Sequence, residues 1–253
     1  MMLRDYFLPE GQQRALAAYG RFACGKGWTI QEKIDLYESS CCAFGAAMGE
    51  DDAFRAFENI YKNLAGGWQV FRPDSPIVCW PSRQIFKTIQ NEFKEFAWGG
   101  TLDLSNFMSS GKQEPLLLKL AKMEGIKSNK GYPVMAVSKF LHFYNPGLFP
   151  IYDYQVIWRK VFKRFKGEFK EFCFASKLPY NTEETGVFLR NYVCWASYLI
   201  GEAHPPRFME AFVEWLGKQP GCKLPEGKFD ARSLFATAFE FTAIGAANAD
   251  LSN

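Results

Sequence analysis

Apolar residues recur every three to four positions along most of this 253-residue chain, and this period limits the fold more than any other feature of the sequence. It is the spacing of helices that bury one face. We expect helices over residues 10–22, 31–48, 51–65, 82–97, 114–124, 132–144, 153–166, 168–176, 183–201, 206–217 and 230–244. Strand-like sequence is confined to residues 68–80, where prolines separate two short apolar runs. The sequence therefore predicts a mainly α fold with at most a small β-hairpin.

Gly99 and Gly100 mark the predicted boundary between two helical lobes. We expect an N-terminal helical lobe over residues 1–99, a second lobe over 100–245 and a tail over 246–253, although the two lobes can share one core. No apolar run is long enough to span a membrane, and no apolar stretch follows the first methionine. We expect a cytoplasmic monomer that does not contact membranes.

The supply of metal ligands is small. The chain has seven cysteines without a C-x-x-C pair and two histidines, His142 and His204. Zinc sites and iron–sulfur clusters need closely spaced thiolates or several histidines. We therefore expect no metal and no cofactor.

The net charge of +3 conceals a strong asymmetry, because residues 122–170 carry +7 and the remainder carries −4. At about 100° per residue, the basic side chains after residue 153 fall on one arc of a helix and large apolar side chains on the opposite arc. The basic residues are Arg159, Lys160, Lys163, Arg164, Lys166 and Lys170. This pattern predicts a cationic ridge for a polyanion; an ordinary solvated helix face is the alternative.

A glycine-bearing turn precedes the helix expected to begin near Pro133. Unpaired backbone N–H groups at a helix start, with lysines beside them, suit a phosphate. The residues expected to contact it are Lys127, Asn129, Lys130 and Gly131. A capped helix with solvated lysines is the alternative.

Asp153 stands where the next helix should begin. As an N-cap its carboxylate would accept a hydrogen bond from the N–H of Gln155 or Val156. Alternatively, the same carboxylate, flanked by Tyr152 and Tyr154, serves chemistry at the mouth of a cleft beside the basic residues. The residues alone leave both interpretations open.

The run Phe149-Pro150-Ile151-Tyr152-Asp153, with Val156 three places on and Gly131 upstream, resembles the helix-hairpin-helix DNA glycosylase superfamily over residues 126–166. In that family a glycine hairpin grips the DNA backbone and a motif like F-P-I-x-D places a catalytic aspartate at a helix start. The run 138–143 (S-K-F-L-H-F) adds a looser resemblance to bacterial proteins that carry both patterns. The resemblance implies a helix-hairpin-helix lobe with Asp153 as its catalytic residue.

Family members that also cut the backbone carry a lysine just after the hairpin's second glycine, where this chain has Tyr132 and Pro133. The resemblance therefore implies a monofunctional enzyme, in which Lys139 contacts substrate or phosphate and forms no Schiff base. Asp153 would stabilise the cationic sugar as the N-glycosidic bond breaks.

The family flips its target base out of double-stranded DNA into an aromatic pocket. By resemblance, the pocket residues are Tyr152, Tyr154 and Trp158, and the residues that hold the DNA backbone beside the turn are Gln155, Arg159, Lys160 and Lys163. The excised base would be damaged or modified, in DNA repair or in defence against phages with hypermodified bases. The alternative is a non-catalytic nucleic-acid-binding or interaction module that keeps the fold. A small-molecule hydrolase is a weaker third hypothesis, because no paired-carboxylate or nucleophile motif is present.

Overall fold

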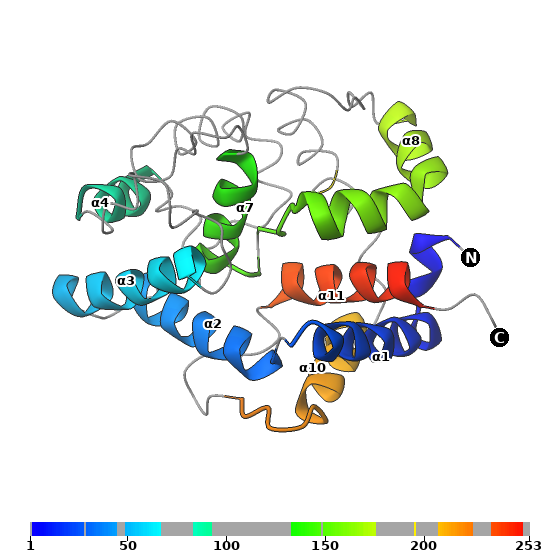
Figure 1. The fold of residues 1–253 in the computed structure, drawn as a ribbon, viewed down its shortest axis with the longest axis horizontal. Coiled ribbons are helices and arrows are strands. Elements are labelled where there is room, and N and C mark those ends of the chain that lie inside the picture. Colours follow the sequence, from blue (N-terminus) through cyan, green and yellow to red (C-terminus); the bar gives the residue numbers. More distant parts are fainter. Residues whose placement is uncertain are drawn as a thin grey trace.

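The regular elements are all helices in the part of the chain that the computed structural model describes, residues 2–27, 29–44, 49–66, 83–92, 133–147, 149–175, 195, 207–224 and 234–249. They are η1 (Leu3–Phe7), α1 (Pro9–Gly25), α2 (Ile30–Phe44), α3 (Glu50–Gly66), α4 (Arg83–Glu92), α7 (Pro133–Tyr144), η3 (Tyr154–Phe162), α8 (Lys166–Ala175), α10 (Phe208–Gly217) and α11 (Phe235–Asn248) (Figure 1). The mainly α fold is confirmed.

The sequence predictions that lie outside these ranges include the helix over 114–124, the hairpin over 68–80 and the lobe boundary at Gly99 and Gly100. Of the helix over 183–201 only Trp195 is described, in a helical conformation. The sequence did not indicate that η1 is a 3-10 helix and η3 a π-helix. No helix in the described ranges has the length and apolar character needed to cross a membrane.

Helix α11 lies at the centre of the fold, with every residue from Ala236 to Ala246 buried. It packs against α1, η3, η1 and α10, and Figure 1 shows it between α1 and η3. A helix buried on all sides needs small and apolar residues all round, which the run FATAFEFTAIGAAN provides with the single exception of Glu240. Helix α11 therefore packs in the same core as α1, near the other end of the chain.

Helices α1 and α11 approach closely because Gly245 has no side chain. A methyl group at position 245 would lie 1.8 Å from the carbonyl oxygen of Ala15. Ala15 is itself fully buried. Glycine is required here for backbone contact.

Aromatic rings fill the core around α11. Phe239 stacks on Phe7 with 4.9 Å between ring centroids and lies 4.8 Å from Trp195. Phe241 stacks on Tyr19 at 4.0 Å. Such pairs bury large apolar areas and add specific ring contacts, so residues from both ends of the chain share one core.

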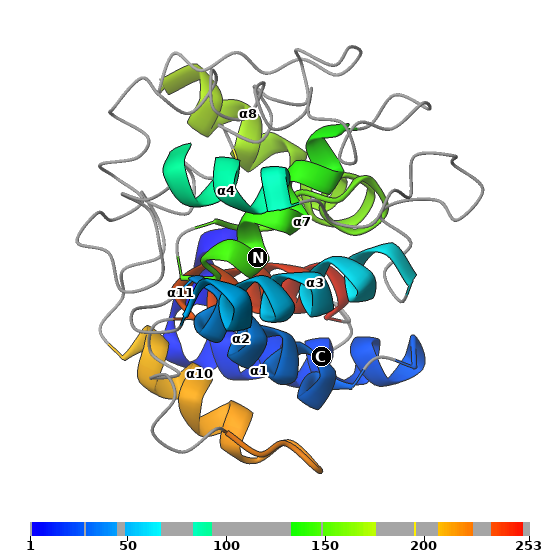
Figure 2. The ribbon, with the colours of Figure 1, turned by 90° about the vertical axis from the view of Figure 1, so that its left-hand side faces the viewer.

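Helices α2, α3 and α7 form a second group of mutual contacts, which Figure 2 shows beside α11. Tyr37 of α2 is fully buried, and its ring lies 5.5 Å from that of Phe143 on α7. The end of α7 and the loop that follows it are therefore enclosed by α2 and α11. This loop carries the candidate site.

Candidate functional site

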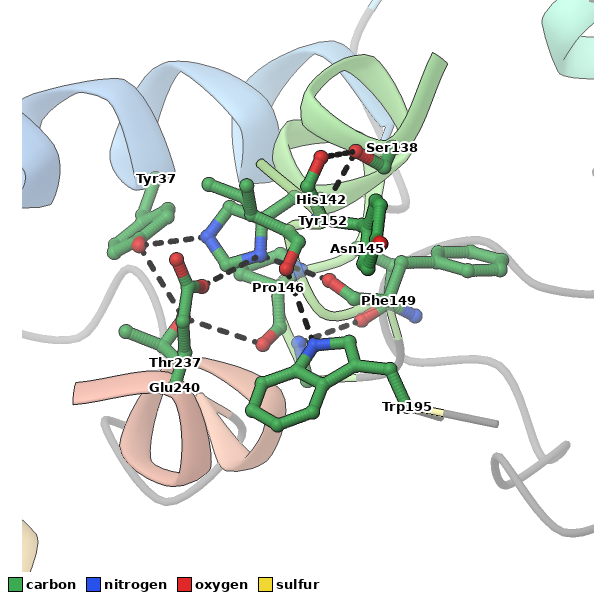
Figure 3. A network of polar contacts seen from close by, with 12 residues as sticks. Tyr37, Ser138, His142, Asn145, Pro146, Phe149, Tyr152, Trp195, Thr237 and Glu240 are labelled. Atoms are coloured by element: carbon green, nitrogen blue, oxygen red, sulfur yellow. Dashed lines mark hydrogen bonds and ion pairs between the residues drawn. The ribbon is translucent and has the colours of Figure 1, made fainter. Parts of the chain in front are cut away.

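The loop from Phe149 to Asp153 joins α7 to η3, and buried side chains hold its backbone (Figure 3). Ser138 of α7 bonds Tyr152 twice: its hydroxyl donates to the carbonyl oxygen at 3.0 Å and accepts from the N–H at 3.1 Å. Buried backbone groups outside regular structure need such partners. Ser138 therefore fixes the residue directly before Asp153.

His142, one turn further along α7, fixes the start of the loop. Its Nδ1 lies 2.8 Å from the carbonyl oxygen of Phe149, and its Nε2 lies 2.8 Å from the Tyr37 hydroxyl. A carbonyl only accepts, so Nδ1 carries the proton and Nε2 accepts from Tyr37. The hydroxyl of Thr237 on α11 lies 3.2 Å from the Tyr37 oxygen. These bonds link α2, α7 and α11 to the loop.

Burial lowers the pKa of His142 to about 3, with a further contribution from the positive charge of Lys33. The imidazole is therefore neutral at physiological pH. A neutral ring suits its role as donor to one neighbour and acceptor from another.

Ile151, in the middle of the loop, is held from both sides. The indole Nε1 of Trp195 donates to its carbonyl oxygen at 3.1 Å, and the carboxylate of Glu240 accepts from its N–H. Glu240 is 3% exposed. Its Oε2 lies 3.8 Å from Nδ1 of His142 and has no hydrogen-bond partner in the described ranges. The backbone of the loop is therefore held in part by the buried carboxyl group of Glu240.

Burial, with a smaller contribution from the negative charge of Asp153, raises the pKa of Glu240 from 4.5 to about 7. The positive charges of Lys33 and Lys139 and the bond from the Ile151 N–H act in the opposite direction. Desolvation is the dominant cause, as expected for a carboxyl group among apolar side chains.

Asp153 is the N-cap of η3, as the sequence predicts. Its backbone is extended, and its Oδ1 accepts from the N–H of Val156 at 2.8 Å. Its Oδ2 lies 3.0 Å from Nζ of Lys139, with side-chain exposures of 18% for the aspartate and 13% for the lysine. The structure thus joins the two candidate catalytic residues in one ion pair that solvent still reaches.

Lys33 of α2 is a further buried charge near this pair. It is 8% exposed, and its Nζ lies 4.5 Å from the centre of the Phe241 ring. Burial lowers its pKa, against the pull of the negative charges on Glu240 and Asp153. We call Lys33, Lys139, Asp153 and Glu240 the charge cluster.

Sequence reasoning missed Lys33 and Glu240. A signal for Glu240 was available: it is the only ionisable residue in the apolar and small-residue run 235–247. A charge at such a position is buried unless the helix turns that face outward, and buried charges need partners. Lys33 gave no comparable signal, because its helix contains several charged residues.

The expected cationic ridge is only partly exposed, and this corrects the sequence prediction for Lys160 and Arg164. Nζ of Lys160 lies 2.9 Å from Oδ1 of Asn248, and Arg164 donates to the carbonyl oxygen of Ala247 at 2.8 Å. Cations are favourable at a helix C-terminus, which is where both contacts fall on α11. In η3, moreover, the N–H of Trp158 bonds the carbonyl of Asp153, and wider π turns rotate side chains away from the arcs of an α-helix.

Five other polar side chains of η3, α8 and the residues between them are exposed. We call this set the η3–α8 stripe: Gln155, Arg159, Lys163, Lys166 and Lys170. The carboxylate of Glu168 is engaged by the backbone N–H groups of Leu3 and Arg4, whereas Glu171 is exposed directly after Lys170 in the chain. The stripe is therefore mainly cationic.

Two of the three expected pocket rings lie in or against the core. Tyr152 is fully buried, and its ring packs edge-on against Phe162 at 6.0 Å. Trp158 is partly buried and lies 5.4 Å from the same ring. The prediction that Tyr152 lines an open pocket is corrected, because a base cannot stack on a covered ring. The side chain of Tyr154, and Lys127, Asn129, Lys130 and Gly131, lie outside the described part of the chain.

Comparison with known proteins gives no relative: no protein-family model, curated protein or solved structure matches this chain.

Proposed function

We propose that this protein is a monofunctional DNA glycosylase that hydrolyses the N-glycosidic bond of a damaged or modified base. One observation carries the proposal: Asp153 is fixed at the start of η3 by Val156 and Lys139, on a loop whose backbone is held by buried side chains, and remains partly exposed. A carboxylate held in one geometry is what stabilisation of a developing cation requires.

The chemistry assigned to Asp153 is electrostatic. Departure of the base leaves positive charge on the sugar, which a fixed carboxylate stabilises while it orients the attacking water. The Nζ atom of Lys139, 3.0 Å from Oδ2, helps to hold that carboxylate in one position. In this proposal Lys139 forms no bond to the sugar.

The η3–α8 stripe supplies contacts to the DNA backbone. Arg159 and Lys163 are exposed one turn apart, and Gln155 precedes them on the same helix that Asp153 caps. Phosphate contacts of this kind position a duplex without reading its sequence. The stripe begins two residues after Asp153, so a duplex bound along it would bring a sugar near the carboxylate.

The test does not require knowledge of the base. Two DNA duplexes are compared, one with a neutral tetrahydrofuran abasic analogue and one with a pyrrolidine analogue whose protonated nitrogen mimics the cationic sugar. The wild-type protein should bind the cationic duplex more tightly, because catalysis requires affinity for the transition state. The substitution Asp153→Asn should remove the preference. Asp52→Asn is the matched control, since Asp52 is exposed in the first turn of α3.

Equal affinity of the wild-type protein for both duplexes, or an unchanged preference in Asp153→Asn, would contradict the proposal. A panel of duplexes with modified bases, treated with alkali after incubation, then identifies the substrate. Strand breaks that require Asp153 mark the excised base.

The non-catalytic nucleic-acid-binding module is also favoured by a specific observation. Both carboxylate oxygens of Asp153 have structural partners, whereas the stripe remains exposed. In that case Asp153→Asn leaves DNA binding and the ratio of the two affinities unchanged, and Arg159→Glu with Lys163→Glu abolishes binding.

A further inference from the structure

Glu240 has a position that loop support alone does not explain. Its carboxylate accepts from the N–H of Ile151, two residues before Asp153, while its Oε2 lies buried with no hydrogen-bond partner in the described residues. A buried polar atom without a partner is unfavourable. Such an atom beside a candidate reactive carboxylate calls for a functional account.

We propose that Glu240 is a positioning residue of the Asp153 site, whose ionised carboxylate adds a second negative charge near Asp153 and strengthens the binding of a cationic sugar. This role rests on the proposed glycosylase function. Glu240 touches neither sugar nor base, and it acts through the loop and through its charge.

The groups that face Glu240 come from the elements packed around α11. They are Tyr19 of α1, Lys33 and Tyr37 of α2, Lys139 and His142 of α7, and Asp153 before η3. On the other neighbours of α11, Asp5 of η1 accepts from the N–H of Met2, and Glu214 of α10 pairs with Lys218. Lys160 and Arg164 contact the C-terminal end of α11.

The charge of the cluster therefore changes with the proton of Glu240. His142, with its pKa lowered to about 3, is neutral. Ionisation of Glu240 adds one negative charge to the cluster. The pKa of Glu240, raised to about 7, places this change between pH 6 and pH 8.

The two abasic duplexes measure this change directly. The preference of the wild-type protein for the cationic over the neutral duplex should rise about sixfold from pH 6 to pH 8. One unit charge acting over about 10 Å at an effective dielectric constant of about 20 changes an affinity by about 16-fold, and Glu240 with its pKa at about 7 is neither fully protonated at pH 6 nor fully ionised at pH 8. The quantity compared is the affinity for the cationic duplex divided by the affinity for the neutral duplex. Both duplexes make the same phosphate contacts, so any effect of pH on those contacts cancels in this ratio.

Glu240→Gln keeps an oxygen for the Ile151 N–H but cannot ionise. Its preference should stay near the wild-type value at pH 6 and show no rise. Glu214→Gln is the matched control, because it removes the same charge from an exposed surface pair and should behave as wild type. Lys33→Gln removes a cation that favours ionisation of Glu240, so the midpoint of the rise should move to higher pH.

The outcomes separate the two proposals. A preference for the cationic duplex with the same pH dependence in wild type and Glu240→Gln overturns the role of Glu240 and leaves the glycosylase proposal standing. No preference in the wild-type protein at any pH overturns both.

Discussion

Replacing Glu240 by glutamine should change how the stability of the protein depends on pH, in a way that needs no substrate. Burial raises the pKa of this carboxyl group from 4.5 to about 7. A difference of one pKa unit between folded and unfolded chains corresponds to about 1.4 kcal/mol. The shift is therefore worth about 3 kcal/mol of pH-dependent stability.

The sign follows from which state binds the proton more tightly. Below pH 4.5 the carboxyl group of Glu240 is protonated in both states, and its contribution is fully present. As the pH rises from 4.5 toward 7 the unfolded chain ionises while the folded protein keeps its proton, so stability is lost. Above pH 7 both states are ionised, and no further loss occurs.

His142 produces the opposite dependence over part of this range. Its pKa falls from 6.5 to about 3 on folding, so stability is lost as the pH falls below 6.5. Between pH 4.5 and 6.5 the two contributions oppose each other in the wild-type protein. In Glu240→Gln the histidine contribution is no longer opposed by this carboxyl group, so stability should fall on acidification below pH 6.5, by about 1.4 kcal/mol per pH unit from His142.

The assay is urea unfolding at 25 °C, followed by helical circular dichroism, at intervals from pH 4.5 to pH 7.5. The difference in unfolding free energy between wild type and Glu240→Gln reports the loss of the titrating carboxyl group and should change by about 3 kcal/mol, with the wild type relatively weaker at high pH. The surface variant Glu214→Gln should show no change over this range. A constant difference between wild type and Glu240→Gln would refute the reasoning.

Three further predictions concern the loop, the core and the stripe. Ser138→Ala removes two buried hydrogen bonds and should lower the unfolding free energy by about 2 kcal/mol, measured by urea titration. Gly245→Ala should destabilise the protein by about 3 kcal/mol, whereas Gly25→Ala, where a methyl group meets nothing within 4 Å, should leave the melting temperature near that of wild type. Arg159→Gln with Lys163→Gln should reduce the slope of log affinity for duplex DNA against log salt by roughly two.

The sequence predicted a mainly helical fold because most of the helices bury one face, and burial of one face leaves a period in the chain. Asp153 as the N-cap of η3 was also predictable, because a carboxylate at a helix start has a local partner three residues on. The ion pair between Lys139 and Asp153 was not predicted. It depends on how far the loop turns back against α7, which local pattern does not encode.

The incorrect predictions about site residues also have physical causes. The cationic ridge was predicted from the 100° spacing of an α-helix, but η3 is a π-helix. In addition, Lys160 and Arg164 bind the C-terminal end of α11. Tyr152 lies in a loop, where no period indicates which side chains point inward. Glu240 reaches Ile151 from a helix almost ninety residues further on, and contacts of that range have no local signature.

The acid at position 240 needs an explanation beyond support of the loop. The loop needs an acceptor for the Ile151 N–H, and a glutamine oxygen would accept that bond without burying an ionisable group. Glutamate at this position carries a desolvation penalty that shows in its raised pKa. Loop support alone does not account for that penalty. The role proposed for Glu240 does account for the penalty, because it requires a negative charge that acts on Asp153 and Lys139. Glutamine lacks that charge.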